Sequence, residues 1–284
     1  MVNPLLTTIG KYRRRLLYGV VSAAVALGLI VGTANPAPAQ SWLELIFRGV
    51  QVIQLSAMSD RQEMGLGSQI NEQIIGRGEG QFQLYSDDAI QDYVKGIGDR
   101  LVPHSGRPNL DYTFQVVEDD AVNAFATMGG YVYITTGLMK AADNEAQLAS
   151  VVGHEIGHIV GKHAVKQLRQ VAIAQGAMTA AGVEDSVLVN IAVELGISRP
   201  HSREDEREAD TFGLENITRA GYAPSAMPEF MAKLLQAGSP PSFLSTHPSV
   251  ASRVEDLNAQ IDSATANQGD GLDEAAYQAT VDSL

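Results

Sequence analysis

The stretch His154-Glu155-Ile156-Gly157-His158 decides how this sequence is interpreted. On a helix, residues four positions apart lie on the same face, so His154 and His158 can offer two imidazoles to one metal ion. Glu155 lies one step round the helix, where it can accept a proton from a metal-bound water. The spacing H-E-x-x-H therefore predicts a metal site with a general base beside it.

The neighbouring residues predict the helix that this spacing requires. Asn144 followed by Gln147 is an N-cap signature, and Glu145 suits the first turn. Apolar residues then recur at helical spacing, namely Leu148, Val151, Val152, Ile156 and Ile159. Gly153 and Gly157 each weaken a helix by about 1 kcal/mol relative to alanine, so we interpret them as positions where another segment packs closely. An ordinary amphipathic helix would not explain two histidines and a glutamate in apolar surroundings.

A second acidic motif offers a third ligand. Residues 202–210 open another helix with a serine and an aspartate as its capping pair. Glu206 and Asp210 lie four positions apart on one face of it, so one carboxylate can bind the metal while the other orients a ligand histidine. We interpret Glu204 and Glu208 as solvated charges.

Four segments, taken together, resemble a known family. They are Asn123-Ala124-Phe125-Ala126 leading into Gly129-Gly130-Tyr131-Val132-Tyr133-Ile134-Thr135-Thr136-Gly137-Leu138, then the H-E-x-x-H stretch, then S-R-x-x-E-x-x-A-D at 202–210, then Ser245-Thr246-His247-Pro248 with Arg253. Their types and order resemble the gluzincin metallopeptidases of the HtpX, Oma and CAAX prenyl endopeptidase group, peptidase family M48, in its short exported bacterial form. The resemblance covers residues 60–262.

The resemblance implies a fold and a set of roles. The fold would be α+β and mainly helical: a zincin-like (gluzincin) peptidase domain with a small β-sheet beside the active-site helix. One zinc ion per chain would bind His154, His158 and Glu206. Glu155 would act in catalysis, and Asp210 would support a ligand from outside the metal site.

His247 falls within the resemblance, and two roles are open for it. It can donate to the oxyanion of the reaction, the role we favour from the sequence because a neutral histidine can donate while leaving zinc open, or it can bind zinc in a resting state and block the open position. Pro248 restricts its backbone, and Arg253 can support either role through a charge-assisted hydrogen bond. As a loop histidine before a helix it would be merely structural.

The other histidines are not expected to be ligands. On a continuous helix His163 lies near the opposite side from His154, which favours a supporting or surface position. His104 and His201 fall in predicted loops and are interpreted as structural or solvated.

The segment from Ala124 to Thr136 is predicted to form an exposed edge strand beside the helix with the two histidines. An extended peptide can add to such an edge through backbone hydrogen bonds. The residues expected to receive it are Ala124, Phe125, Gly129, Gly130 and Tyr131.

The first 39 residues have the form of a signal peptide. A basic start is followed by an uncharged, mostly apolar stretch and by Ala37-Pro38-Ala39, a small-x-small cleavage site. The stretch is at the short limit for a membrane span, so an uncleaved N-terminal anchor is the alternative, with peripheral membrane association. Either form predicts an exported protein in a periplasm or an equivalent lumen. We expect residues 40–60 to be a connecting amphipathic segment, 61–262 the peptidase domain and 263–284 a flexible acidic tail.

Composition excludes several classes. Hydrophobic residues make up 45% and charged residues 19%, which is typical of a globular chain. Removing residues 1–39 leaves 16 basic and 33 acidic residues, a net charge of −17, which disfavours a nucleic-acid partner. The chain has no cysteine, so zinc ligation must use histidine and carboxylate.

Two functions from different classes remain. The first is a zinc-dependent endopeptidase that hydrolyses unfolded or damaged envelope proteins in quality control. The alternative is a chaperone or binding protein on a peptidase scaffold with little turnover. A purely structural zinc site is disfavoured, because such sites usually have four protein ligands and favour cysteine.

Overall fold

The computed structural model describes residues 58–76, 80–174, 185–237, 241–282 and 284. The predicted signal segment 1–39 lies outside these ranges, as does the connecting segment 40–60 apart from its last residues. Within the described ranges, no helix combines the length and the apolar character that a membrane crossing requires.

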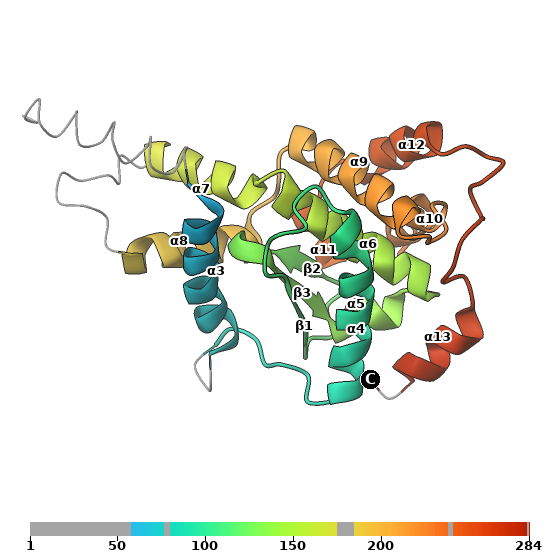
Figure 1. The fold of residues 1–284 in the computed structure, drawn as a ribbon, viewed down its shortest axis with the longest axis horizontal. Helices are drawn as coiled ribbons and strands as arrows, with labels where there is room; N and C mark the ends of the chain where they lie inside the picture. The colour runs from blue at the N-terminus through green and yellow to red at the C-terminus, as the bar shows by residue number, and fades with distance from the viewer. Residues whose placement is uncertain (1–57, 77–79, 175–184, 238–240, 283) are drawn as a thin grey trace, which may run out of the picture. The chain divides into compact units, whose positions relative to one another are not determined.

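Over the described residues the protein is mainly helical with a small sheet, as the sequence predicts (Figure 1). The helices are α3 (Asp60–Ile75), α4 (Asp88–Leu101), η2 (Val102–His104), η3 (Met128–Gly130), α5 (Thr136–Ala141), α6 (Glu145–Val160), α7 (His163–Ala174), α8 (Asp185–Ser198), α9 (Arg203–Arg219), α10 (Ala226–Leu235), α11 (Ser242–Thr246), α12 (Val250–Gln260) and α13 (Glu274–Val281). The strands are β1 (Thr113–Val117), β2 (Ala124–Ala126) and β3 (Tyr131–Thr135).

The sheet has the order β1-β3-β2. Strand β1 runs parallel to β3 with Thr113 opposite Tyr131, and β2 runs antiparallel to β3. The β2–β3 connection needs glycine, because Gly129 and Gly130 have φ angles of 78° and 96°. This turn lies against α3, where a Cβ added at Gly67 would come 2.2 Å from the carbonyl oxygen of Met128.

Alternate strand residues bury their side chains in two different apolar clusters, as the two-residue period of a strand requires. Val132 and Ile134 pack with α4, α6, α9 and α10. Tyr133, between them, packs with α3, α7 and α8. Its hydroxyl donates to Asn71 Oδ1 of α3 at 2.9 Å. Helix α6 therefore lies in the cluster on one face of the sheet, and α3, α7 and α8 lie in the cluster on the other (Figure 1).

Helices α6 and α9 pack in close contact because both carry glycine where they meet. A Cβ at Gly157 would lie 2.5 Å from the carbonyl oxygen of Ala209, and one at Gly213 would lie 3.0 Å from the backbone nitrogen of His154. A Cβ at Gly153 would lie 2.9 Å from Ile217 Cγ2. The prediction that Gly153 and Gly157 allow close packing is confirmed.

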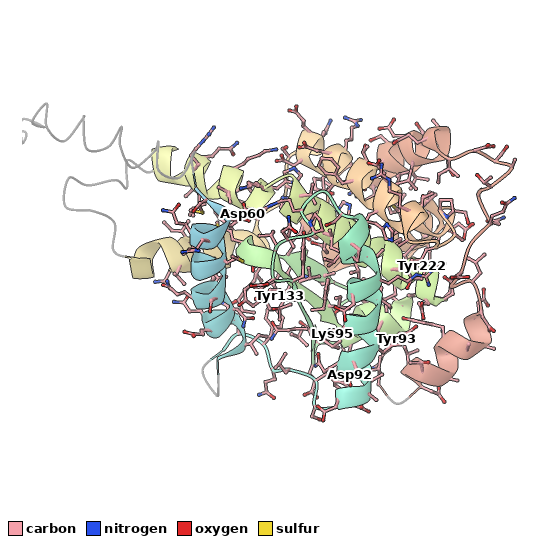
Figure 2. All side chains as sticks on the ribbon, in the orientation of Figure 1. Asp60, Asp92, Tyr93, Lys95, Tyr133 and Tyr222 are labelled. Carbon is pink, nitrogen blue, oxygen red and sulfur yellow. The ribbon has the colours of Figure 1, made fainter. Side chains whose placement is uncertain are left out.

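The start of α6 is fixed by side chains from other segments. Tyr93 of α4 and Tyr222, both labelled in Figure 2, donate their hydroxyls to Glu145 at 2.8 and 2.9 Å. The predicted N-cap is confirmed, since the Asn144 side chain accepts a hydrogen bond from the Gln147 backbone at 3.0 Å. Helix α6 is thus fixed both by these hydrogen bonds at its first turn and by its packing against α9.

The prediction of a flexible tail over 263–284 is wrong for its last part. Residues 274–281 form α13, in which Tyr277 is 2% exposed and donates to the carbonyl oxygen of Met139 at 2.7 Å. Asp273 caps the helix by accepting from the Ala276 backbone. Tyr277 and Val281 lie four residues apart on one face, and that short apolar face is enough to anchor the helix among otherwise small and acidic residues.

Candidate metal centre

Three segments bring four ligand-type side chains to one buried place. Helix α6 supplies His154 and His158, the first turn of α9 supplies Glu206, and His247 follows α11. All four are buried, and one donor atom from each lies within 4.8 Å of the others. The structure therefore brings together the three residues predicted as ligands and the histidine whose role was open.

The distances between these donor atoms test whether a zinc ion fits. His154 Nε2 lies 3.1 Å from His158 Nε2, 3.3 Å from His247 Nδ1 and 3.6 Å from Glu206 Oε2. Glu206 Oε1 lies 3.4 Å from His158 Nε2 and 3.2 Å from His247 Nδ1. Zinc bonds of about 2.0–2.2 Å put tetrahedral donors roughly 3.3–3.6 Å apart. These residues fit one zinc ion, with His247 as a fourth donor.

Asp210 orients the first of the histidines. Its Oδ1 lies 3.0 Å from His154 Nδ1, so that nitrogen donates its proton and the lone pair of Nε2 faces the cluster. Although burial raises it, hydrogen bonds from Arg253 and His154 hold the pKa of Asp210 below its usual value. The predicted position of Asp210, outside the cluster and behind a histidine, agrees with this geometry.

Arg253 has different partners from those expected. Its Nε and Nη2 donate to the two oxygens of Asp210 at 2.6 Å each, and its Nη1 donates to Glu206. No hydrogen bond from it to His247 is found among the described residues, so the expected support of His247 is wrong. The reason is that α12 packs against α9 and turns this guanidinium toward the carboxylates of that helix. Burial raises the pKa of Glu206, but the charge and hydrogen-bond interactions with His247 and His158 outweigh this and hold that pKa well below its usual value.

Glu155 is buried beside the cluster without a hydrogen-bonded partner. It is 0% exposed, and neither carboxylate oxygen has a hydrogen-bond partner in the part of the chain that the structure covers. His247 Nε2 is unpartnered in the same sense and lies 3.5 Å from Glu155 Oε1. Burial raises the pKa of Glu155, against the opposing effect of His247. A carboxylate with a raised pKa is suited to accept a proton near neutral pH.

Two further histidines lie against His158: His201, in a contact that the sequence did not indicate, and His163, in the supporting position that was one of its two predicted positions. His201, interpreted as structural or solvated, stacks on His158 with ring centroids 4.0 Å apart. Burial, together with His247, lowers the pKa of His201 to about 3. His163 is fully buried, and its Nδ1 lies 2.8 Å from His158 Nδ1. The contact of His201 had no signal in the sequence, because this histidine lies in a predicted loop. The direction of the His163 side chain was predicted for a continuous helix, but α6 ends at Val160. His104 is exposed.

The predicted substrate segment is at the sheet edge but is not exposed. Strand β2 is an outer strand of the sheet and is in contact with α6, yet all of its residues are buried. Gly129 and Gly130 are buried in the turn against α3, and Tyr131 is half-buried. Helix α8 packs on β2, where a Cβ at Gly196 would lie 2.9 Å from Thr127 Cγ2. The expectation of an exposed strand is wrong because α3 and α8 cover it.

The paired helices, the small sheet and the His-His-Glu cluster define a zincin-like peptidase domain. Residues 88–261 match the model described as Peptidase family M48. This chain belongs to peptidase family M48, whose peptidases use a metal.

Relatives agree with this assignment. The chain is 31% identical over 261 residues to the "Beta-barrel assembly-enhancing protease" of Escherichia coli (strain K12), covering 86% of this chain and 52% of that protein. It is 33% identical over 172 residues to the "Mitochondrial metalloendopeptidase OMA1" of Arabidopsis thaliana, covering 59% of this chain and 35% of that protein. The Schizosaccharomyces pombe protein of the same name is 30% identical over 176 residues, 58% of this chain and 51% of that protein. The chain spans about half the length of the E. coli relative.

Proposed function

We propose that this chain is a zinc-dependent endopeptidase that hydrolyses peptide bonds in unfolded or damaged envelope proteins. The observation that carries the proposal is the buried Glu155 carboxylate, which lacks a hydrogen-bond partner among the described residues, beside four donor atoms spaced as zinc ligands. A chaperone or binding protein on the same scaffold would need no general base beside the donor atoms. That alternative predicts zinc binding without turnover.

Each residue then has a definite task. His154, His158 and Glu206 would hold the metal, which supplies a Lewis acid that polarises the scissile carbonyl and acidifies a water molecule. Glu155 accepts the proton of that water and passes it to the leaving amine. Burial of the site keeps bulk water away from these charges and strengthens their interactions.

The ligand set is tested by the zinc content of Glu206→Ala. The purified parental chain should carry one zinc ion, and the variant should lose most of it during dialysis, because it lacks the negatively charged donor of the four, which the remaining imidazoles do not replace. Glu215→Ala is a matched control, since this glutamate lies on α9 at the surface, where it pairs with Arg219. Undiminished zinc in folded Glu206→Ala would remove Glu206 from the site.

His247 is proposed to act as a latch in the resting enzyme. Its Nδ1 lies among the ligand donors, within 3.3 Å of His154 Nε2, where a fourth ligand blocks the position that substrate and water need. Its ring stacks on Phe243 at 4.2 Å, and its backbone nitrogen donates to the carbonyl oxygen of Phe243. The contact with α11 holds the imidazole in this direction.

The latch and the oxyanion role predict opposite signs for His247→Ala. We expect turnover of an unfolded protein to rise by more than about twofold, because the open form becomes more populated. Steady-state rates at equal zinc content measure this, and Phe243→Leu should shift the rate in the same direction by a smaller factor. A fall of more than about twofold would assign His247 to the oxyanion, and no change would make it structural.

The substrate is proposed to be an unfolded chain of the envelope. Glu155 is 0% exposed, so a peptide bond can reach it only within a segment free to extend and enter the site. The name of the E. coli relative, a "Beta-barrel assembly-enhancing protease", supports an envelope setting, as does the predicted signal segment. Cleavage of one stable protein should be at least about tenfold faster in its denatured than in its native form, since only the open fraction is cut. Equal rates on both forms would contradict this.

A further inference from the structure

His163 links the candidate metal centre to the surface of the protein. It is the first residue of α7 and is 0% exposed. Its Nδ1 lies 2.8 Å from Nδ1 of His158, and its Nε2 lies 3.0 Å from Oε2 of Glu208 on α9. Glu208, interpreted from the sequence as a solvated charge, is therefore a partner of a buried histidine.

The nitrogen that carries the proton in His158 and in His163 follows from the groups at the two ends of this hydrogen-bonded series, the metal site and the Glu208 carboxylate. His158 Nε2 faces the donor cluster, so its lone pair must be free for the metal and its proton lies on Nδ1. His163 Nδ1 must then accept that proton's hydrogen bond, which leaves the proton of His163 on Nε2. Nε2 donates to Glu208, a carboxylate that only accepts. Both hydrogen bonds therefore point away from the metal centre: His158 donates to His163, and His163 donates to Glu208.

The backbone between α6 and α7 is shaped to place this ring. Helix α6 ends at Val160, and Lys162 has a φ angle of 54°, which is uncommon for a residue other than glycine. A Cβ at Gly161 would lie 2.3 Å from His163 Nε2, so a larger residue here would displace the ring from its present position. On a continuous helix His163 would lie far round from His158, and the break at 161–162 turns it onto that residue.

The outer end of this chain of groups already holds a cation. Lys166 Nζ lies 3.0 Å from Glu208 Oε2 and 3.6 Å from Asp205 Oδ1. Asp205 Oδ1 also lies 3.4 Å from His163 Nε2. The ammonium group of Lys166 supplies the positive charge between these carboxylates, so we assign the cluster to the support of His163 and not to a second metal ion.

We infer that His163 is a positioning residue for the metal ligand His158, and that Glu208 holds His163 in turn. This rests on the zinc site of the proposed function. Hydrogen bonds to the outer nitrogen of a ligand histidine fix its tautomer and ring direction and raise its basicity, and their loss commonly costs about 10–100-fold in metal affinity. The outer nitrogen of His154 receives the same support directly from a carboxylate, that of Asp210, whereas His158 receives it through a second imidazole.

The inference is tested by zinc affinity in the full chain, measured by competition with a chromophoric chelator. His163→Leu keeps much of the side-chain volume but removes the acceptor, and zinc affinity should fall by about 10–100-fold. His163→Asn places an amide oxygen near the former Nδ1, and should restore affinity to within about threefold of the parent. Glu208→Ala should weaken binding by about threefold to tenfold, less than His163→Leu because Asp205 remains. Glu204→Ala, exposed on the same helix, is the control and should bind as the parent does.

The thermal midpoint of each metal-free variant separates positioning from packing. A residue that only fills space would lower the midpoint of His163→Leu and leave zinc affinity at the parental value, and that result would overturn the inference. If His163→Leu does not fold, parental affinity in Glu208→Ala overturns it equally. A parental chain that binds no zinc would instead refute the proposed function, because the affinity assay needs no turnover.

Discussion

Glu155→Gln is expected to keep one zinc ion per chain and to lose peptide hydrolysis by at least about a hundredfold. Glutamine has almost the same shape as glutamate, so the packing of α6 and the positions of His154 and His158 should not change. Its amide cannot accept the proton of the attacking water. The carboxylate it replaces is fully buried, and burial raises its pKa, which makes it the best placed general base beside the cluster.

The measurement is the rate of casein cleavage by parent and variant at equal, measured zinc content. Glu215→Gln, at the surface of α9, makes the same chemical change away from the site and should cleave at the parental rate. Cleavage of casein by Glu155→Gln at the parental rate would show that another group removes the proton. A loss of zinc in the variant would show that Glu155 helps to bind the metal instead.

Arg253→Met is expected to destabilise the metal-free chain by about 3–5 kcal/mol. Arg253 is 1% exposed, and its guanidinium lies between the carboxylates of Glu206 and Asp210. Methionine has a similar length but no charge, so two buried carboxylates would lose their shared cation. Removing one partner of a buried ion pair is strongly destabilising for that reason. Bound zinc should offset part of the loss, because it neutralises Glu206 and binds only the folded chain.

Urea unfolding in the presence of a chelator measures this effect. A matched control joins the same two helices at the surface: Arg207 of α9 donates to Asp256 of α12 at 2.9 Å, and both side chains are about half exposed. Arg207→Met should change the free energy of unfolding by only about 0–1 kcal/mol. Equal effects of the two substitutions would mean that the buried pair contributes no more than the exposed one.

The sequence predicts the cluster well because its information is local. His154 and His158 are related by one helical turn, as are Glu206 and Asp210, and helical spacing needs no knowledge of the tertiary fold. The contact between the helices that carry these two pairs was also indicated locally, by the glycines of α6 at which α6 and α9 meet. The partner of Arg253 had no such signal, because it depends on how α12 lies against α9.

The supporting position of His163 was one of two that the sequence left open, and the burial of the strand was not predicted, because both depend on tertiary packing. The position of His163 was predicted for a continuous helix, and the break at Gly161 and Lys162 reverses the direction of its ring. The two-residue period predicts β3 and the outer strand β2, but not that α3 and α8 cover them. In α13, two anchoring side chains were outweighed by the acidic composition around them.

Anomalous X-ray scattering at the zinc edge, from crystals of the zinc-loaded chain, tests the central claim most directly. We expect one zinc peak per chain, at about 2.0–2.2 Å from Nε2 of His154, Nε2 of His158 and a carboxylate oxygen of Glu206. Glu155 should lie beside the peak without binding it. A peak at another place, or a zinc ion bound by neither α6 histidine, would contradict the account.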